Sequence, residues 1–404
     1  MKAVVYSGNE GICGVVSERE LSRPVLSSAE AARSSWCRST LCWLLTQAAA
    51  LALSTLRVAV FLSTGRLPNM YGEDPHRYHV LCKTHAVGVN PCDAKMLYGD
   101  KVPVWALQLV AWSVRGRPAG MDFSGVVVQA AGPFRAGDEV FGVIPPFQGS
   151  LAEYVLAPSD AIALKPRGLS HCAACVVPLV GLTALQLLDE VGGGGGELRH
   201  VLVVGGSGGV GHCVVQLAKR LGARVTAVCS RKNAQLVAGL GADEVVPYDA
   251  GALVGGLLEA VQRGGQFDLV VDTVSSNEQR DPLADGSQAR SYPSICSDPQ
   301  APLLRPGGRY VRTGGPPGDW LRAHLQRHWH LGLSLLPTQL FWVRLSGCAA
   351  QLRQLCHLCE SGQLRVLLSE TLPFTAEGVS RAFRLCMTRR VVGKIAISLE
   401  TAAE

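Results

Sequence analysis

Charged side chains are scarce in this sequence: Asp, Glu, Lys and Arg make up 17% of the 404 residues, whereas hydrophobic residues make up 48%. This balance excludes a disordered chain and indicates a globular protein. The length is sufficient for two domains, each with its own hydrophobic core. The formal net charge of +6 is too small for this length to indicate a nucleic-acid partner, so we expect none.

A regular cysteine framework is also missing. The 14 cysteines are scattered along the chain, which favours a reducing compartment over secretion. Two C-x-x-C pairs, Cys172/Cys175 and Cys356/Cys359, lie far apart, and we interpret both as small buried thiols rather than as metal or redox sites. We therefore expect a cytoplasmic protein; a mitochondrial or plastid location with membrane association is the alternative.

Targeting and membrane-spanning signals are weak. The first residues, MKAVVYSG, read directly as a β-strand, so no cleavable leader is expected before the fold. Residues 41–62 form an apolar run long enough to span a membrane, but Gln47 and Arg57 interrupt it. We interpret the run as part of an insertion, residues 27–75, on a soluble body; membrane association through 41–62 is possible but not favoured.

Two kinds of pattern divide the rest of the chain. Short apolar runs bounded by Gly, Pro and Asp fill residues 78–165 and predict a compact β domain. From about residue 170, apolar strands alternate with helices expected at 210–221, 233–240 and 252–263, which predicts a parallel, doubly wound sheet. The fold class is therefore α/β, with a β catalytic domain at 1–26 and 76–170, completed by 355–404, and a Rossmann-type nucleotide-binding domain at 171–354.

A glycine-rich loop follows the first strand of the predicted parallel sheet. Gly206, Gly208 and Gly211 fit the pattern G-x-G-x-x-G between a strand and a helix, which is the context that gives this pattern meaning. Such glycines allow a tight turn, a close approach of the backbone to a pyrophosphate, and close helix packing. We expect a dinucleotide to bind at Gly206, Ser207, Gly208, Gly209, Val210 and Gly211; a glycine-rich turn without ligand is the alternative.

The end of the next strand lacks a carboxylate. Sites that prefer NAD carry an acidic residue there, about 20 residues after the loop, to bind the ribose hydroxyls. Here the strand RVTAVCS ends in Ser230 and is followed by Arg231 and Lys232. A hydroxyl and two cations would attract a 2′-phosphate, so NADPH is the expected cofactor in preference to NADH; for the two cations, a solvated helix start is the alternative.

At this point the sequence resembles the medium-chain dehydrogenase/reductase superfamily, in its zinc-independent quinone oxidoreductase and enone/alkenal reductase branch. The resemblance covers residues 1–25 and 78–400. The motifs that carry it are, in chain order, AVGVNPCDAKMLYG, GMDFSGVVV, GDEVFGVIPPFQGSLAEYV, VPLVGLTAL, GGSGGVG, LGADEVVPY, FDLVVDTV and GKIAISL. The resemblance implies a GroES-like β domain interrupted by a Rossmann domain, with the active site between them. Dimers are usual in such families, so a homodimer is expected.

Ligands for zinc are absent where zinc-dependent relatives have them. Those relatives place a cysteine where this chain has Asn90 and a His-Glu pair where it has Met121 and Asp122, and residues 93–171 contain no cysteine for a second zinc. A tetrahedral N/S site cannot be built from these residues, so no metal is expected and zinc-alkoxide chemistry is disfavoured.

The motif VNPCDAK supplies the expected catalytic residues. The resemblance implies that Asn90 lines the nicotinamide and substrate pocket, and its amide can donate to the substrate's carbonyl oxygen as negative charge develops there. Lys95 stands where related enone reductases have a lysine, and we expect it to stabilise the enolate or donate a proton, with Asp93 orienting it. For Lys95, a surface lysine after a structural Asn-Pro turn is the alternative.

Three further residues are cofactor candidates through the resemblance. Thr183 matches a threonine near the cofactor cleft, Tyr248 a tyrosine beside the adenosine phosphate, and Thr273 ends the strand FDLVVDTV. A helix-interior threonine and core packing with a wet hydroxyl are the plain alternatives for the first two. The predicted function is zinc-free, NADPH-dependent reduction of small quinones or α,β-unsaturated carbonyl compounds, by one or two electrons. A nucleotide-binding protein with a structural or interaction role is the competing class.

Overall fold

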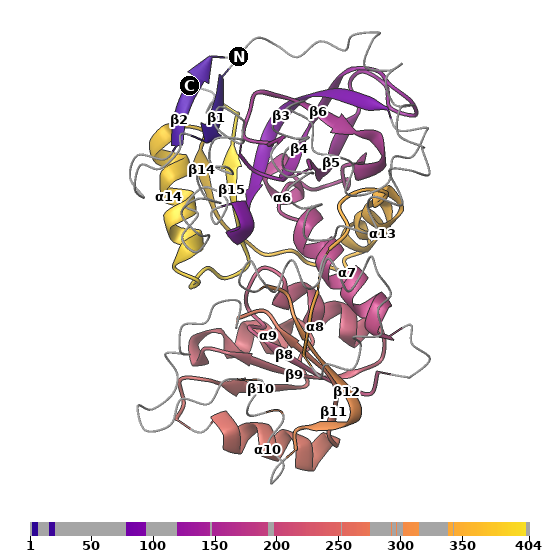
Figure 1. The fold of residues 1–404 in the computed structure, drawn as a ribbon, viewed down its shortest axis with the longest axis vertical. Helices are drawn as coiled ribbons and strands as arrows, with labels where there is room; N and C mark the ends of the chain where they lie inside the picture. The colour runs from indigo at the N-terminus through magenta and orange to yellow at the C-terminus, as the bar shows by residue number, and fades with distance from the viewer. Residues whose placement is uncertain are drawn as a thin grey trace, which may run out of the picture.

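The computed structural model describes residues 2–6, 16–20, 78–93, 119–145, 148–192, 198–251, 253–274, 302–314, 338–341 and 343–400, together with Tyr292 and Cys296. These residues form two lobes stacked along the long axis of the molecule, each built on its own sheet (Figure 1). The apolar run 41–62, the insertion 27–75 and Lys95 all lie outside the described residues.

The lower lobe in Figure 1 is a six-stranded parallel sheet with the strand order β10-β9-β8-β11-β12-β13. Strand order reverses after β10, because the chain returns past β8 to add β11 on its other side. Such a reversal creates a crevice at the carboxyl ends of the strands, where α/β proteins bind their ligands. The elements of the lower lobe are β8 (His200–Val204), α8 (Gly211–Arg220), β9 (Arg224–Cys229), η3 (Arg231–Asn233), α9 (Ala234–Gly239), β10 (Glu244–Pro247), α10 (Leu253–Gly264), β11 (Phe267–Asp272), β12 (Leu304–Arg312) and β13 (Thr338–Leu340).

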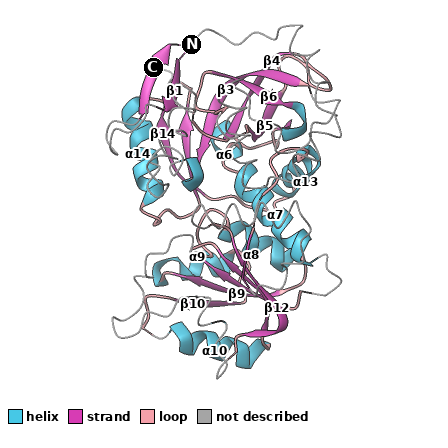
Figure 2. Ribbon diagram, viewed as in Figure 1, coloured by secondary structure: helices cyan, strands magenta, loops and turns pink. Residues whose placement is uncertain are grey.

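Helices cover both faces of this sheet, which explains its continuous apolar strands. Alternate residues of β8 point to opposite faces. Val201 and Val203 belong to a core cluster with residues of α8 and α9, whereas Leu202 and Val204 belong to a second cluster with residues of α10. Figure 2 shows the helices on either side of the strands.

The upper lobe is a largely antiparallel sheet with the order β14-β15-β3-β4-β5-β7, with β6 also paired to β3 (Figure 1). Residues far apart in sequence meet here, because β15 from the end of the chain pairs with β3, with Ile395 opposite Val89. A separate hairpin joins β1 (Lys2–Tyr6) and β2 (Val16–Glu20). The other elements of this lobe are β3 (His79–Val89), β4 (Asp122–Gln129), β5 (Glu139–Val143), β6 (Tyr154–Pro158), η2 (Ser159–Ala161), β7 (Ile162–Leu164), α6 (His171–Ala174), β14 (Leu368–Pro373), α14 (Ala376–Met387) and β15 (Lys394–Ser398).

Two helices connect the lobes: α7 (Pro178–Gly192) and α13 (Ala349–Glu360). Both contribute leucines to one large cluster that also contains Phe141 of β5 and Val201 of β8, so a single hydrophobic core runs between the sheets. Among the described residues, the stretch His171–Glu190 is long and apolar enough to cross a membrane, with a mean hydropathy of 1.8, and 89% of its most apolar window is buried inside the protein. Such burial is what a core helix requires.

Candidate active site

The glycine-rich loop lies between β8 and α8, at the point predicted from the sequence. Gly211 begins α8, and a Cβ there would overlap the carbonyl oxygen of Gly205, so only glycine lets the helix start this close to the preceding turn. Gly205 itself has a φ of 85°, a region that other residues rarely adopt.

The loop presents unused hydrogen-bond donors. No side chain caps α8, and the amides of Ser207, Gly209 and Val210 have no acceptor among the described residues. Free amides at a helix N-terminus bind anions, because they donate hydrogen bonds and because the helix dipole favours negative charge there. These residues therefore fit the pyrophosphate of a dinucleotide.

The end of β9 lies beside the loop. The side chain of Asn233 donates to the Ser207 hydroxyl (3.1 Å), which joins the two segments. The Ser230 hydroxyl is buried and has no hydrogen-bond partner among the described residues. A buried hydroxyl without a partner is unfavourable, so a polar ligand at this edge would satisfy it. Arg231 and Lys232 follow Ser230 and are exposed.

Two groups at this edge were not found from the sequence. Asp249 accepts a hydrogen bond from the Arg231 amide (2.7 Å), so a carboxylate lies near the end of β9 after all. Arg390, from the segment after α14, donates to the hydroxyl of Tyr248 (2.7 Å) and brings a third cation to this region. Both come from segments outside the nucleotide fingerprint, so the local motif contains no signal for them.

A second group of polar residues is fully buried at the end of β3. Asn90, Asp93, Asp122 and Lys394 are at most 4% exposed. Lys394 donates to the side-chain oxygen of Asn90 and to the backbone oxygen of Val89 (2.7 Å), and its ammonium lies 3.4 Å from a carboxylate oxygen of Asp122. We refer to these four residues as the Asn90 cluster.

Asn90 is saturated within this cluster. Its side-chain nitrogen donates to Asp122 (3.0 Å) and Asp93 (3.2 Å), while its oxygen accepts from Lys394. An amide nitrogen has two hydrogens, and both are used here. Asn90 therefore holds the cluster together, and in this geometry both amide hydrogens are engaged within the protein; its expected role as a donor to the substrate stays a prediction.

Asp93 is the unusual member of the cluster. One oxygen accepts from the backbone and side chain of Asn90 (3.0 and 3.2 Å), and the other is buried and has no partner within the part of the chain that the structure describes. Burial, reinforced by the nearby charge of Asp122, raises the pKa of Asp93 to about 7. Burial also raises the pKa of Asp122, and the Lys394 ammonium opposes that rise. One ammonium thus faces two carboxyl groups, and the raised pKa makes Asp93 easier to protonate than an ordinary aspartate.

Asp122 also fixes the start of α7. Its second oxygen accepts from the amide of Leu179 (2.8 Å), one of the donors that a helix start leaves without an internal partner. One turn later, the Thr183 hydroxyl donates to the Leu179 oxygen (2.7 Å). Thr273 similarly donates to the Val204 oxygen (2.8 Å) at the end of β8. Thr183 lies on α7 and Thr273 directly follows β11. The hydroxyl hydrogen of each threonine is donated to a backbone oxygen.

Contacts between the lobes connect the glycine loop to the Asn90 cluster. The amide of Gly393, next to Lys394, donates to the backbone oxygen of Ser207 (2.9 Å). His212 is fully buried, and its ring contacts the Gly208 oxygen (2.8 Å) through Nδ1 and the Leu367 amide (3.1 Å) through Nε2. The backbone oxygen of Leu367 accepts from the Lys394 amide (2.8 Å). The loop and the cluster are therefore parts of one hydrogen-bonded unit.

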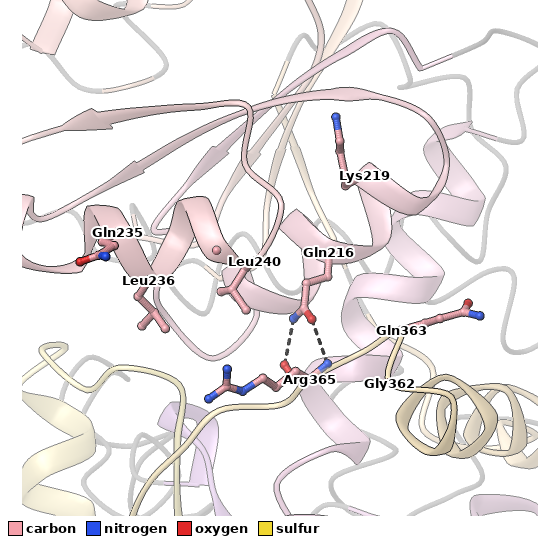
Figure 3. Close-up of a pocket in the computed structure, with 9 residues that line it drawn as sticks. Gln216, Lys219, Gln235, Leu236, Leu240, Gly362, Gln363 and Arg365 are labelled. Atoms are coloured by element: carbon pink, nitrogen blue, oxygen red, sulfur yellow. Dashed lines mark hydrogen bonds between the residues drawn. The ribbon is translucent and has the colours of Figure 1, made fainter.

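A pocket of about 410 Å³ lies elsewhere, between α8, α9 and residues 362–365 (Figure 3). It contains none of the site residues predicted from the sequence. Gln216 of α8 crosses it with two hydrogen bonds to the backbone of Arg365 (2.8 and 2.9 Å), which Figure 3 shows as dashed lines. These bonds fasten the segment after α13 to the nucleotide-binding lobe.

The two sheets, one with a glycine loop and one carrying a buried polar cluster, are the framework of a two-domain protein, and the comparisons with known proteins identify its class as that of the dehydrogenases. Family models agree: "Alcohol dehydrogenase GroES-like domain" matches residues 76–167 and "Zinc-binding dehydrogenase" matches residues 240–397. The chain is 30% identical to the mitochondrial NAD(P)H oxidoreductase RTN4IP1 of Homo sapiens, over 79% of this chain and 81% of that protein. It is 31% identical to the trans-enoyl reductase pgmF of Aspergillus terreus, over 80% and 86%.

Solved structures show the same architecture. The quinone oxidoreductase from Coxiella burnetii superposes with a TM-score of 0.66 at 22% identity, covering 99% of both chains. The chain therefore belongs to the medium-chain dehydrogenase/reductase family, in the branch of quinone and enoyl oxidoreductases. This confirms the predicted family and the predicted fold class, a GroES-like domain with a Rossmann domain.

Proposed function

We propose that this nicotinamide-dependent oxidoreductase uses NADPH to reduce quinones or α,β-unsaturated ketones and aldehydes by hydride transfer, without a catalytic metal. The observation that carries the proposal is the hydrogen bond from the Gly393 amide to Ser207 of the glycine loop, because it supports a dinucleotide bound at the loop reaching the neighbourhood of the Asn90 cluster. The names of the curated relatives, an NAD(P)H oxidoreductase and a trans-enoyl reductase, agree with it.

Cofactor selection is assigned to the edge of β9. The loop amides of Ser207, Gly209 and Val210 would bind the pyrophosphate. The unpartnered Ser230 hydroxyl and the cations of Arg231, Lys232 and Arg390 would bind the 2′-phosphate of NADPH. Asp249 lowers the positive potential there, but its side chain is engaged by the Arg231 amide. Cations outnumber this carboxylate, which favours the phosphorylated cofactor.

The proposed reaction needs a hydride, which a reduced nicotinamide supplies. It also needs a group that donates a hydrogen bond or a proton to the substrate's carbonyl oxygen, because negative charge develops there. Asn90 cannot be this donor while both its amide hydrogens bind Asp93 and Asp122. We assign that role to Lys95, two residues after Asp93, and assign Asn90 and Lys394 to holding the pocket wall in shape. Protonation of Asp93, which its raised pKa favours, would leave one carboxylate opposite the Lys394 ammonium.

Zinc does not fit the residues at this position. An ion among Asn90, Met121 and Asp122 would find an amide, a thioether and one carboxylate, none of them the thiolate or imidazole that zinc prefers. The ammonium of Lys394 already contacts Asn90 and Asp122. We therefore derive no metal-dependent step.

The experiment that tests the proposal measures NADPH binding and oxidation separately. Purified protein is mixed with NADPH or NADH and a panel that contains a quinone, an alkenal and an enone. We expect oxidation of NADPH with at least one acceptor and slower oxidation of NADH. Binding of NADPH without oxidation by any acceptor would favour a structural or interaction role; equal use of both cofactors would overturn the assignment of Ser230, Arg231 and Lys232.

The assembly and the compartment also remain proposals. We propose a homodimer acting on a small-molecule substrate. The cytoplasmic location expected from the sequence stays a prediction, and the mitochondrial relative agrees with its alternative.

A further inference from the structure

Two histidines face each other on the GroES-like lobe, away from the residues assigned above. The imidazole of His85 on β3 and that of His171 at the start of α6 have ring centroids 4.5 Å apart. Each ring meets a glutamate: Nδ1 of His85 lies 2.9 Å from Glu400, and Nε2 of His171 lies 3.2 Å from Glu139. Single ligand atoms of His85, His171 and Glu400 all lie within 4.8 Å of one another.

The hydrogen bonds around His171 identify its ring nitrogens. The hydroxyl of Ser124 donates its single hydrogen to the backbone oxygen of Val140 (2.9 Å), so toward Nδ1 of His171 (2.8 Å) it can only accept. Nδ1 therefore carries a hydrogen, and in the neutral ring Nε2 carries the lone pair. That lone pair faces a carboxylate oxygen of Glu139, an arrangement that is unfavourable unless a proton or a metal ion bridges the two atoms.

These features are those of a metal-binding histidine. Metal-bound imidazoles commonly donate the other ring N–H to an oxygen that fixes the ring's orientation, as Ser124 does here. The elements that carry the site are firmly held. The backbone oxygen of His85 accepts from Leu399 (2.8 Å), next to Glu400, and Ser170 caps α6 through the Ala173 amide (3.2 Å).

Access and charge also suit a cation. The side chain of His171 is 10% exposed and that of His85 is 24% exposed, whereas both glutamates are more than half exposed, so the cluster is buried on one side and open to solvent on the other. Lys165 lies 3.3 Å from Glu139 and balances the charge of that carboxylate. If both imidazole rings are neutral, the negative charge of Glu400 is then available to a cation.

We propose that His85, His171, Glu139 and Glu400 bind one Zn²⁺ ion, which would tie the end of β15 to β3, β5 and α6. Two imidazoles and carboxylates are an established zinc donor set. With bonds of about 2.1 Å, tetrahedral ligand atoms lie about 3.4 Å apart. The ligand atoms of His85, His171 and Glu400, which lie within 4.8 Å of one another, would therefore close in by roughly an ångström. The exposed glutamates have the rotational freedom to do so. This site is separate from the Asn90 cluster and does not depend on the proposed reductase function.

The test is a zinc titration of the full-length, chelator-treated protein by calorimetry, without NADPH. We expect one ion per chain, and at least a tenfold loss of affinity in His85→Ala, His171→Ala and the exposed Glu400→Gln. His357→Ala, which removes an exposed histidine on α13, is the matched control and should bind zinc as the wild type does. Glu400→Gln keeps the test decisive if a histidine variant does not fold.

Cobalt distinguishes this site from the cysteines. Co²⁺ bound by imidazoles and carboxylates lacks the sulfur-to-metal charge-transfer band that a thiolate ligand produces. The proposal predicts a Co²⁺ spectrum without that band, displaced by one equivalent of Zn²⁺. No stoichiometric binding, a thiolate band, or unchanged affinity in Glu400→Gln and the folded histidine variants would each overturn the proposal.

Discussion

Lys394 brings a buried ammonium to two buried carboxyl groups, those of Asp93 and Asp122. A lysine is rarely buried unless it is paired, since desolvation of its charge is costly. Here its ammonium donates to Asn90, to the backbone oxygen of Val89 and, at 3.4 Å, to Asp122.

Replacement of Lys394 by methionine is expected to destabilise the protein by about 3–5 kcal/mol, the usual cost of removing one partner from a buried ion pair. Urea unfolding measures this change. Lys219→Met is the matched control: Lys219 forms an exposed ion pair with Asp243 (2.6 Å), so its loss is expected to cost less than about 1 kcal/mol. Equal effects of the two substitutions would show that the Asn90 cluster has no special dependence on its cation.

Arg390 gives a prediction about cofactor choice. Its guanidinium binds the Tyr248 hydroxyl at the edge of β9, and in Arg390→Gln we expect KM for NADPH to rise about tenfold, equivalent to about 1.4 kcal/mol. KM for NADH should change little, because NADH lacks the 2′-phosphate. Steady-state kinetics with both cofactors measure this, with Arg353→Gln on the exposed face of α13 as control. A parallel rise for both cofactors would place Arg390 outside the phosphate site.

At the scale of elements, α8 is held in place by His212, which links the glycine loop to the segment before β14. Because Nε2 accepts from the Leu367 amide, the ring must be neutral there, and Nδ1 then donates to the Gly208 oxygen. Burial lowers the pKa of His212 to about 4.

This shift sets a pH window for stability. In the unfolded chain histidine has a pKa of about 6.5, so the unfolded state binds more protons between pH 6.5 and 4. The stabilisation is complete above about 6.5 and falls progressively as pH decreases to about 4, by roughly 3 kcal/mol in all. Urea unfolding of wild type and His212→Asn across this range measures it. The wild type should have the larger free energy of unfolding above pH 6.5, and this excess over His212→Asn should shrink as the pH falls. An excess that does not change with pH would contradict the role assigned to the neutral ring.

Sequence patterns predicted the elements of the nucleotide-binding lobe well. The helix expected at 210–221 is α8 at Gly211–Arg220, and the one expected at 252–263 is α10 at Leu253–Gly264. These segments are strongly periodic and are bounded by glycines, so local signals suffice. The short β13 was not predicted, because three residues carry too little periodicity to indicate a strand.

At the scale of the whole molecule, the site depends on contacts that no local pattern contains. The motif VNPCDAK identified Asn90 and Asp93, but their partner Lys394 lies 304 residues from Asn90 in sequence. It reaches them only because β15 pairs with β3. Arg390 and Asp249 reach the edge of β9 in the same way, from segments beyond the glycine loop.

The arrangement of the two lobes makes the glycine loop and the Asn90 cluster one hydrogen-bonded unit. We propose that a hydride is transferred from NADPH to the substrate at this unit. The most direct measurement uses NADPH with deuterium at either face of nicotinamide C4 and an enone as acceptor. We predict that one of the two labelled cofactors delivers a single deuterium to the β-carbon of the saturated product, with one NADPH consumed per product. Turnover that leaves no deuterium in the product from either cofactor, or NADPH binding without turnover, would contradict the account.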